Sequence, residues 1–315
     1  MNILVFGKDG QLGKAFQNQL KGALFQAGNT IRFVGRSECD LGNPGQIYSL
    51  LQTSAPQMII NAAAYTAVDK AQSESDLAFV INANAPELMA KYAAQNGATL
   101  LHFSTDYVFD GSKQGAYIET DQTNPLGIYG KSKEAGENAI VNAFSGATHK
   151  NARYGILRAS WVYGDGNNFI KTILRLAKER SALRVINDQH GVPTSASWLA
   201  EVGIHLALDN DRQRQFKSGI YHAVPRGETS WYGLACLVVQ AAVDSGHQLQ
   251  ALPAAISPIP ASEYPLPAPR PMNSRLCTQK LQIELEHLGL VSKLSHWNTP
   301  WDEQVRAYVK QLLVN

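Results

Sequence analysis

Short, almost uninterrupted apolar runs alternate with longer amphipathic stretches along the first half of the chain. The apolar runs are rich in aliphatic residues and too short for buried helices, so they predict strands that are buried on both faces. The predicted strands cover residues 2–7, 31–36, 57–64 and 98–105, and the predicted helices cover residues 10–20, 43–55 and 73–97. This alternation predicts an α/β fold with a doubly wound parallel sheet. Ligands bind such sheets outside the carboxyl ends of the strands.

The second half of the chain is less regular and contains a long segment rich in proline. Strands are predicted at residues 154–164, 182–188 and 219–224, and helices at 129–144, 167–180 and 230–246. Proline is so dense in residues 253–274 that a regular helix or a central strand is not expected there. A mobile linker is one interpretation. We favour a rigid, packed segment at the cleft, because Ile256, Ile259, Tyr264 and Leu266 are more apolar than a linker requires.

Composition narrows the class of protein without identifying a site. The chain has 315 residues, 44% of them hydrophobic and 17% charged, as expected for one large or two ordinary globular domains. A net charge of +2 gives no reason to expect nucleic acid or a membrane as partner. The cysteines, Cys39, Cys236 and Cys277, have neither disulfide nor metal-site spacing. We therefore expect a cytoplasmic protein without a bound metal.

Glycines follow the first predicted strand at a spacing typical of nucleotide-binding turns. The stretch GKDGQLG places Gly7, Gly10 and Gly13 between that strand and the next helix. Glycine permits a tight turn and lets a pyrophosphate approach the backbone, where the N–H groups of the helix N-terminus can bind it. An ordinary tight turn is the alternative. Residues 62–64, all alanine, would also let a cofactor lie close to the backbone, although close helix packing explains the same residues.

The end of the second predicted strand bears on the choice between NAD and NADP. An acidic residue there binds the ribose 2′-hydroxyl of NAD, whereas an arginine accommodates the 2′-phosphate of NADP. The stretch FVGRSE presents Arg36 at this place, but Glu38 follows two residues later. We predict that NADPH is the cofactor and that NADH can also be accepted. Asp40 and Leu41 are expected near the adenine end.

A tyrosine and a lysine lie four positions apart in the stretch YGKSK. On a helix, Tyr129 and Lys133 would point to the same side. A nearby ammonium lowers the pKa of a phenol, so Tyr129 could exchange a proton with a substrate oxygen near neutral pH. The structural alternative is a partly buried tyrosine beside a solvated lysine.

These motifs occur in the order typical of the extended short-chain dehydrogenase/reductase superfamily, and the chain resembles one family within it. The stretches NAAAYTAVDKAQSE, STDYVFDG, YGKSKEAGE, RASWVYG, NNFIKTILRLAKE, INDQHGVPTSA and RPMNSRL resemble the dTDP-4-dehydrorhamnose reductases, from residue 2 to about residue 311. The resemblance implies a Rossmann-like NAD(P)-binding domain at residues 1–160, completed by later segments such as 195–225. It also implies a smaller C-terminal α/β domain at residues 161–315 that mainly binds the sugar nucleotide.

The activity implied by the resemblance is reduction of the 4-keto group of a dTDP-4-keto-6-deoxyhexose to dTDP-L-rhamnose by hydride transfer from NADPH. Tyr129 corresponds to the proton donor, Thr105 to the catalytic Ser/Thr, and Lys133 to the lysine that holds the nicotinamide ribose. The remaining cofactor contacts implied by the resemblance are Gly10, Gln11, Leu12, Asp40, Leu41, Ala63, Ala64 and Tyr65.

Contacts with the sugar nucleotide are also implied by the resemblance. Thr105, Asp106 and Trp161 match positions that touch it. Arg270, between prolines, is expected to bind phosphate, for which arginine is well suited. A core tryptophan and a solvated surface arginine are the structural alternatives for Trp161 and Arg270.

Two other functions fit parts of the pattern. A nucleotide-sugar dehydratase or epimerase could share the fold, but dehydratases carry an Asp-Glu pair after the catalytic threonine, and here Tyr107 follows Asp106. A non-catalytic nucleotide-binding regulatory subunit is the second alternative. Some family members dimerise through a metal bridged by glutamates, one of them in the first helix. The stretch GKAFQNQLKGAL has no acidic residue, so we expect a monomer or a homodimer without a bridging metal.

Overall fold

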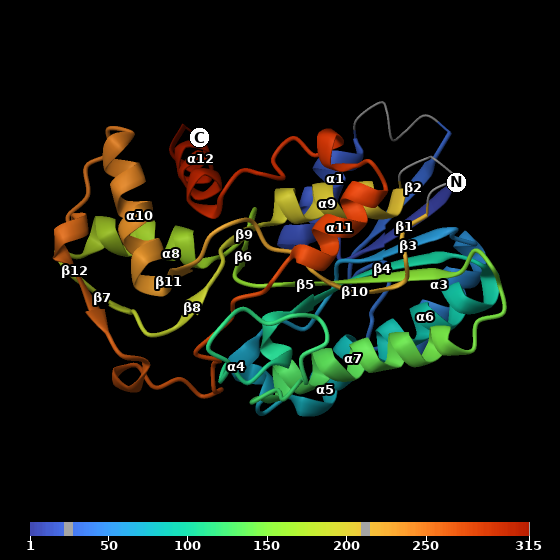
Figure 1. The fold of residues 1–315 in the computed structure, drawn as a ribbon. Coiled ribbons are helices and arrows are strands. Elements are labelled where there is room, and N and C mark those ends of the chain that lie inside the picture. The colour runs from blue at the N-terminus through green and yellow to red at the C-terminus, as the bar shows by residue number, and fades with distance from the viewer. Residues whose placement is uncertain (22–27, 209–214, 315) are drawn as a thin grey trace.

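A parallel sheet forms the centre of the larger part of the molecule. The computed structural model describes residues 1–21, 28–208 and 215–314. Within them, six parallel strands hydrogen-bond in the order β10-β5-β4-β3-β1-β2. The strands are β1 (Asn2–Phe6), β2 (Thr30–Val34), β3 (Met58–Asn61), β4 (Thr99–Thr105), β5 (Arg153–Ala159) and β10 (Gly219–His222). The α/β fold with a doubly wound parallel sheet is confirmed (Figure 1).

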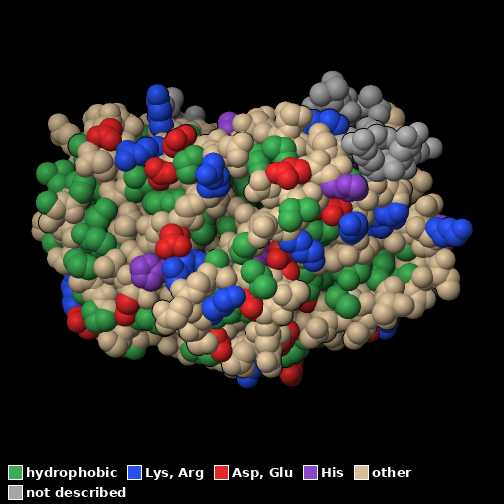
Figure 2. Space-filling model, viewed as in Figure 1, with side chains coloured by type: hydrophobic (Ala, Val, Ile, Leu, Met, Phe, Trp, Pro, Cys, Tyr) green, Lys and Arg blue, Asp and Glu red, His purple; other side chains and the backbone are tan. Residues whose placement is uncertain are grey.

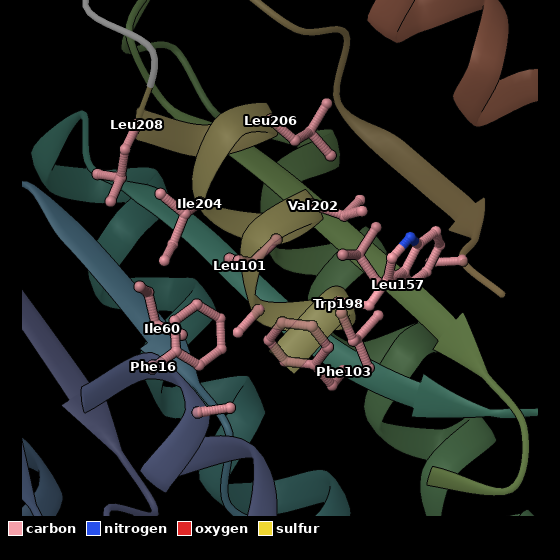
Figure 3. Close-up of a cluster of buried hydrophobic side chains, with 14 of the residues drawn as sticks. Phe16, Ile60, Leu101, Phe103, Leu157, Trp198, Val202, Ile204, Leu206 and Leu208 are labelled. Atoms are coloured by element: carbon pink, nitrogen blue, oxygen red, sulfur yellow. The ribbon is translucent and has the colours of Figure 1, made fainter. Parts of the chain in front are cut away.

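Helices cover both faces of this sheet. One face packs against α1 (Gln11–Leu20), α9 (Ala196–Leu208) and α11 (Gln279–His287), and the other against α3 (Pro44–Ser54), α6 (Ala85–Asn96) and α7 (Ile128–Ser145). Alternate residues of β1 enter the two cores: Ile3 and Val5 enter one, Leu4 and Phe6 the other. This double burial explains why the strands are continuously apolar. Figure 3 shows the first core, where Phe16 of α1 and Trp198 of α9 meet side chains of the central strands.

Helix ends follow the local signals in the sequence, with one difference. The Asn43 side chain accepts hydrogen bonds from the N–H groups of Gly45 and Gln46, at 3.0 and 3.2 Å, so the predicted N-cap is confirmed. The helix predicted at residues 73–97 is interrupted by a π turn, Val80–Asn84, between α5 (Ser75–Phe79) and α6. The Asn82 side chain in this turn accepts from the N–H of Tyr65 and donates to its C=O, at 2.8 and 3.0 Å. The π turn therefore holds a loop that follows β3.

A smaller part of the molecule packs around its own core, away from the main sheet (Figure 1). There α8 (Phe169–Glu179), α10 (Trp231–Asp244) and α12 (Trp301–Val314) pack with the strands β7 (Leu183–Ile186) and β12 (Ile256–Ile259). The single strand predicted at 154–164 is wrong in part, because it divides into β5 and β6 (Val162–Tyr163). Trp161 between them has a φ of 49°, which turns the chain out of the main sheet. The remaining short strands are β8 (His190–Gly191), β9 (Thr194–Ser195) and β11 (Thr229–Ser230).

The proline-rich segment is packed against the smaller part. Ile256 and Ile259 are buried, whereas Tyr264 and Leu266 are exposed. Part of the segment forms β12, a strand not expected from the proline content, which pairs in parallel with β7. Pro258 is tolerated because β12 has a partner on one side only.

The surface carries mixed charge. On the face shown in Figure 2, acidic and basic side chains are interspersed among polar and apolar ones. Across the described part of the chain, each helix is too short or too polar to span a lipid bilayer.

Candidate active site

The turn between β1 and α1 requires its glycines. Gly7 has a φ of 87°, and a Cβ atom there would lie 2.7 Å from the backbone nitrogen of Ala63. A Cβ atom at Gly13 would lie 2.0 Å from the carbonyl oxygen of Gly7. Gly10 forms the N-cap of α1 without a side-chain hydrogen bond. The first N–H groups of α1 therefore remain available to an anionic ligand.

A cavity of about 700 Å³ opens beside this turn. Its wall contains nearly all of the predicted cofactor contacts: Gly7, Gly10, Gln11, Leu12, Arg36, Asp40, Leu41, Ala63, Ala64, Tyr65, Tyr129 and Lys133. Gly13 instead packs beneath the turn, against Gly7. Residues 165–167, which were not predicted from the sequence, also line the cavity. Their position after a predicted strand was the available signal.

The chemistry of the cavity wall fits a dinucleotide. Gln11 Oε1 and Ser104 Oγ are buried without a hydrogen-bond partner among the described residues, and both residues line the cavity. Buried polar atoms of this kind are normally hydrogen-bonded. Together with the free helix N-terminus, they provide polar groups to a ligand that would enter between small residues.

The far end of the cavity lies beyond β2. Arg36 follows the strand, with its side chain 82% exposed and Nε 3.8 Å from Asp40 Oδ2. Gly35 precedes it, and a Cβ atom there would lie 2.1 Å from Asp9 Oδ2. The arginine is thus loosely held at the rim of the cavity, as its sequence position predicts.

Tyr129 and Lys133 lie on one face of α7 and both line the cavity. The Lys133 Nζ donates to the carbonyl oxygen of Phe103 at 2.7 Å. Burial lowers the pKa of Lys133 to about 8. Burial raises the pKa of Tyr129 to about 12, although a hydrogen bond with Thr105 opposes this. The expectation that Lys133 lowers the pKa of this phenol is wrong for this structure, because desolvation dominates and Nζ is held by β4.

Thr105 and Asp106 end the central strand β4 beside Tyr129. Thr105 Oγ1 donates to Asp106 Oδ1 at 3.0 Å and accepts from the N–H of Tyr107 at 3.2 Å. Burial raises the pKa of Asp106 to about 6, against hydrogen bonds from Ser274 and Thr105. Asp106 Oδ2 is buried without a partner among the described residues. Ser274, far away in the sequence, thus meets the end of β4.

Trp161 and Arg270 lie outside the wall of the large cavity. The Trp161 ring stacks on Trp231, with centroids 3.6 Å apart and planes inclined by 15°. The positive φ of Trp161 is a strained backbone state of the kind that clusters at functional sites. Arg270 donates to Asp69 Oδ1 at 2.9 Å and to the carbonyl oxygen of Ala268 at 2.8 Å. The ligand contacts of Trp161 and Arg270 stay predictions.

The proline-rich segment also approaches Tyr129. A narrow pocket is lined by Tyr129 and Tyr107 on one side and by Pro269 and Pro271 on the other. This is the position that was predicted for a packed wall of the cleft.

Comparisons with known proteins cover almost the whole chain. The family model described as RmlD substrate binding domain matches residues 1–313. The dTDP-4-dehydrorhamnose reductase of Escherichia coli K12 is 45% identical over 289 residues, which cover 90% of this chain and 91% of that protein.

Solved structures of dTDP-4-dehydrorhamnose reductases are also similar to this chain over almost its whole length. A dTDP-4-dehydrorhamnose reductase ortholog from Clostridium acetobutylicum superposes with a TM-score of 0.83 at 33% identity, covering 99% of this chain and 100% of that chain. The dTDP-4-dehydrorhamnose reductase of Bacillus anthracis, solved in complex with NADP, gives a TM-score of 0.80 at 31% identity. That match covers 99% of this chain and 98% of the other.

Proposed function

The chain belongs to the dTDP-4-dehydrorhamnose reductase family, and from this premise we propose that it reduces dTDP-4-dehydro-L-rhamnose to dTDP-L-rhamnose with NADPH. The observation that carries the proposal is that Tyr129 and Lys133 line the large cavity while Thr105 meets Tyr129 beside it. Tyr129 and Lys133 come from α7, and Thr105 comes from the end of β4. A cavity that can take a dinucleotide and has a proton donor in its wall suits carbonyl reduction.

NADPH supplies the hydride for this reaction when it is bound. Tyr129 delivers a proton to the carbonyl oxygen, on which negative charge develops during the reduction. Thr105 donates a hydrogen bond to the same oxygen and stabilises that charge. Burial keeps Tyr129 protonated before the reaction, because it raises the pKa of the phenol. Lys133 holds the nicotinamide ribose beside Tyr129.

The sugar nucleotide is bound between the two parts of the molecule. Asp106 and Trp161 contact the sugar, and Arg270 contacts the diphosphate. The unpartnered Asp106 Oδ2 and the strained backbone of Trp161 support these roles. Residues 1–160, with later segments such as 195–225, form the cofactor domain; residues 209–214 of that segment lie outside the described part of the chain. Residues 161–315 mainly form the substrate domain.

Two further assignments complete the proposal. Arg36 binds the 2′-phosphate of NADPH, which its position after β2 supports. The enzyme acts in the cytoplasm, which the free thiols of Cys39, Cys236 and Cys277 support.

The test is a turnover assay with purified protein, dTDP-4-dehydro-L-rhamnose and NADPH. Loss of NADPH absorbance should match the formation of dTDP-L-rhamnose, mole for mole. A regulatory subunit would bind NADPH without oxidising it. A dehydratase or an epimerase would convert a nucleotide sugar without net consumption of NADPH, and either outcome would overturn the proposal.

A further inference from the structure

A fully buried histidine lies directly beside the proposed catalytic lysine. His102 is on β4 and has no exposed surface. Its Nε2 is 3.3 Å from Lys133 Nζ, and its Nδ1 is 3.0 Å from Asn61 Nδ2 at the end of β3. The ring is therefore held between the amine of Lys133 and the amide of Asn61, and neither His102 nor Asn61 has a part in the proposed reaction so far.

The orientation of the Asn61 amide decides where the imidazole carries its proton. Asn61 Oδ1 accepts the backbone N–H of Ala63 at 3.2 Å, so the NH₂ group of Asn61 faces the ring. Burial lowers the pKa of His102, so the ring is neutral. A neutral imidazole has one acceptor nitrogen and one N–H. Nδ1 must accept from Asn61, and the hydrogen is therefore on Nε2.

That hydrogen points at Lys133. An ammonium group has donors only, so a protonated Lys133 would place donor against donor at Nε2. A neutral amine has a lone pair and can accept from Nε2–H while it donates one of its own hydrogens to the carbonyl oxygen of Phe103. We propose that Asn61 and His102 are positioning residues that stabilise the neutral amine of Lys133.

The charged groups around Lys133 are compatible with stabilisation of its neutral amine. Glu137, one turn further along α7, favours the ammonium. Its carboxylate, however, is held by a buried ion pair with Arg158 of β5, through bonds of 2.6 and 2.9 Å. Asp106 acts on the phenol of Tyr129 from the other side. The lowered pKa of Lys133 agrees with a site in which part of the lysine is a neutral amine near neutral pH.

The inference rests on the proposed function and extends it. In the ordinary role, Lys133 is a permanent cation that holds a ribose. With Asn61 and His102 behind it, Lys133 becomes a group that can give up a proton within the working pH range. Turnover should then depend on the protonation state of Lys133 and not only on its presence.

The tautomer of His102 tests the inference without any activity assay. Long-range ¹H–¹⁵N spectra distinguish Nδ1–H from Nε2–H, and a His102→Gln variant assigns the signal. His222 is a reference in the same spectrum: its Nδ1 lies 3.0 Å from the carbonyl oxygen of Tyr117, which can only accept. Above the pKa of Lys133, His102 should be the Nε2–H tautomer and His222 the Nδ1–H tautomer. An Nδ1–H tautomer for His102 would overturn the inference.

The Asn61→Asp variant reverses the arrangement with almost no change of shape. A carboxylate can accept both the Ala63 N–H and an Nδ1–H, so the ring should change tautomer and accept from the Lys133 ammonium at Nε2. The titration midpoint of ¹³Cε-labelled Lys133, assigned with Lys133→Met, should move up by about one pH unit or more. An unchanged midpoint in a folded Asn61→Asp protein would overturn the inference.

Failure of the two proposals can be told apart. If wild-type protein reduces the dTDP-sugar but His102 carries its proton on Nδ1, only the positioning roles are wrong. If the tautomer is as proposed but no NADPH is consumed, only the reductase function is wrong. The spectrum of the wild-type protein decides even where the Asn61→Asp variant does not fold.

Discussion

The ammonium of Lys8, in the glycine-rich turn, forms an ion pair with the carboxylate of Glu38, which follows β2. The same carboxylate accepts from the N–H of Gly35 at 2.9 Å and from Ser37 Oγ at 3.0 Å. The hydrogen bond from Lys8 is the main reason why the pKa of Glu38 is lowered to about 2. Glu38 is thus engaged with its own partners, which reduces its repulsion of a phosphate near Arg36.

The first prediction concerns the cofactor preference. Arg36→Ala should raise Kd and KM for NADPH by about tenfold, because only NADPH carries the 2′-phosphate. The same constants for NADH should stay almost unchanged. We expect an effect of this size because the side chain is largely exposed. The preference for NADPH should also shrink at high salt, since exposed charges are screened.

Arg32→Ala is the matched control for this measurement. Arg32 lies on β2 and donates a hydrogen bond to Ser54 Oγ. Its substitution by alanine removes the same charge as Arg36→Ala, but away from the cavity. Titration by cofactor fluorescence should show no selective effect in this variant. Equal weakening of both cofactors by Arg36→Ala would show that Arg36 does not read the 2′-phosphate.

The second prediction concerns the proton donor. Tyr129→Phe should fold and bind NADPH normally but lose roughly 10²–10⁴-fold in kcat, because only the hydroxyl oxygen with its transferable proton is removed. Tyr154→Phe removes the same atom at the opposite end of the sheet, where Tyr154 packs on Phe144, and should keep its activity. Steady-state kinetics of the two variants check this. Substantial kcat in Tyr129→Phe would exclude the phenol as the acid.

Many residues of the large cavity's wall could be predicted from sequence because their signals are local. The turn with Gly7 and Gly13 lies between one strand and one helix, and its backbone conformation demands glycine. Tyr129 and Lys133 share a face because four residues make about one helical turn. A parallel sheet then brings the ends of β1, β2, β3 and β4 to the same edge.

The rest of the site depends on packing between distant segments. No local pattern predicts that Trp161 stacks on Trp231 or that Arg270 pairs with Asp69. The sign of the pKa shift at Tyr129 was also missed, because desolvation depends on the whole environment of the phenol and not on its spacing from Lys133.

The third prediction concerns the proline-rich segment. A glutamate-specific protease should cut slowly after the exposed Glu263 in wild-type protein, because the flanking strand β12 and the Arg270–Asp69 pair hold the segment. Arg270→Met should make cutting faster. Arg184→Met removes another ion pair on the same segment, with Glu263, but both partners are exposed and the effect should be small. Rapid cutting of wild-type protein, unchanged by saturating dTDP-sugar, would instead indicate a mobile linker.

The last prediction concerns stability and pH at Asp106. The pKa of this carboxyl rises from 3.8 to about 6 in the folded protein, mainly through burial. Between these pH values the folded state binds more protons than the unfolded state, so this group makes the protein less stable as pH rises through the window. The full cost above the window is at most about 3 kcal/mol. Asp106→Asn removes the titration and should therefore increase the free energy of unfolding at neutral pH, while turnover falls.

Denaturant unfolding of Asp106→Asn and wild type, below and above the window, measures this difference. The increase in the free energy of unfolding caused by Asp106→Asn should be large above pH about 6 and small below pH 3.8. Asp110→Asn is the control of opposite sign. Hydrogen bonds, first from the N–H of Ser112, lower the pKa of Asp110 to about 2, so its charged form stabilises the fold and its loss should destabilise the protein at neutral pH. If Asp106→Asn is instead less stable at neutral pH, hydrogen bonds to the carboxylate outweigh its burial, and Asp106 is charged when the substrate arrives.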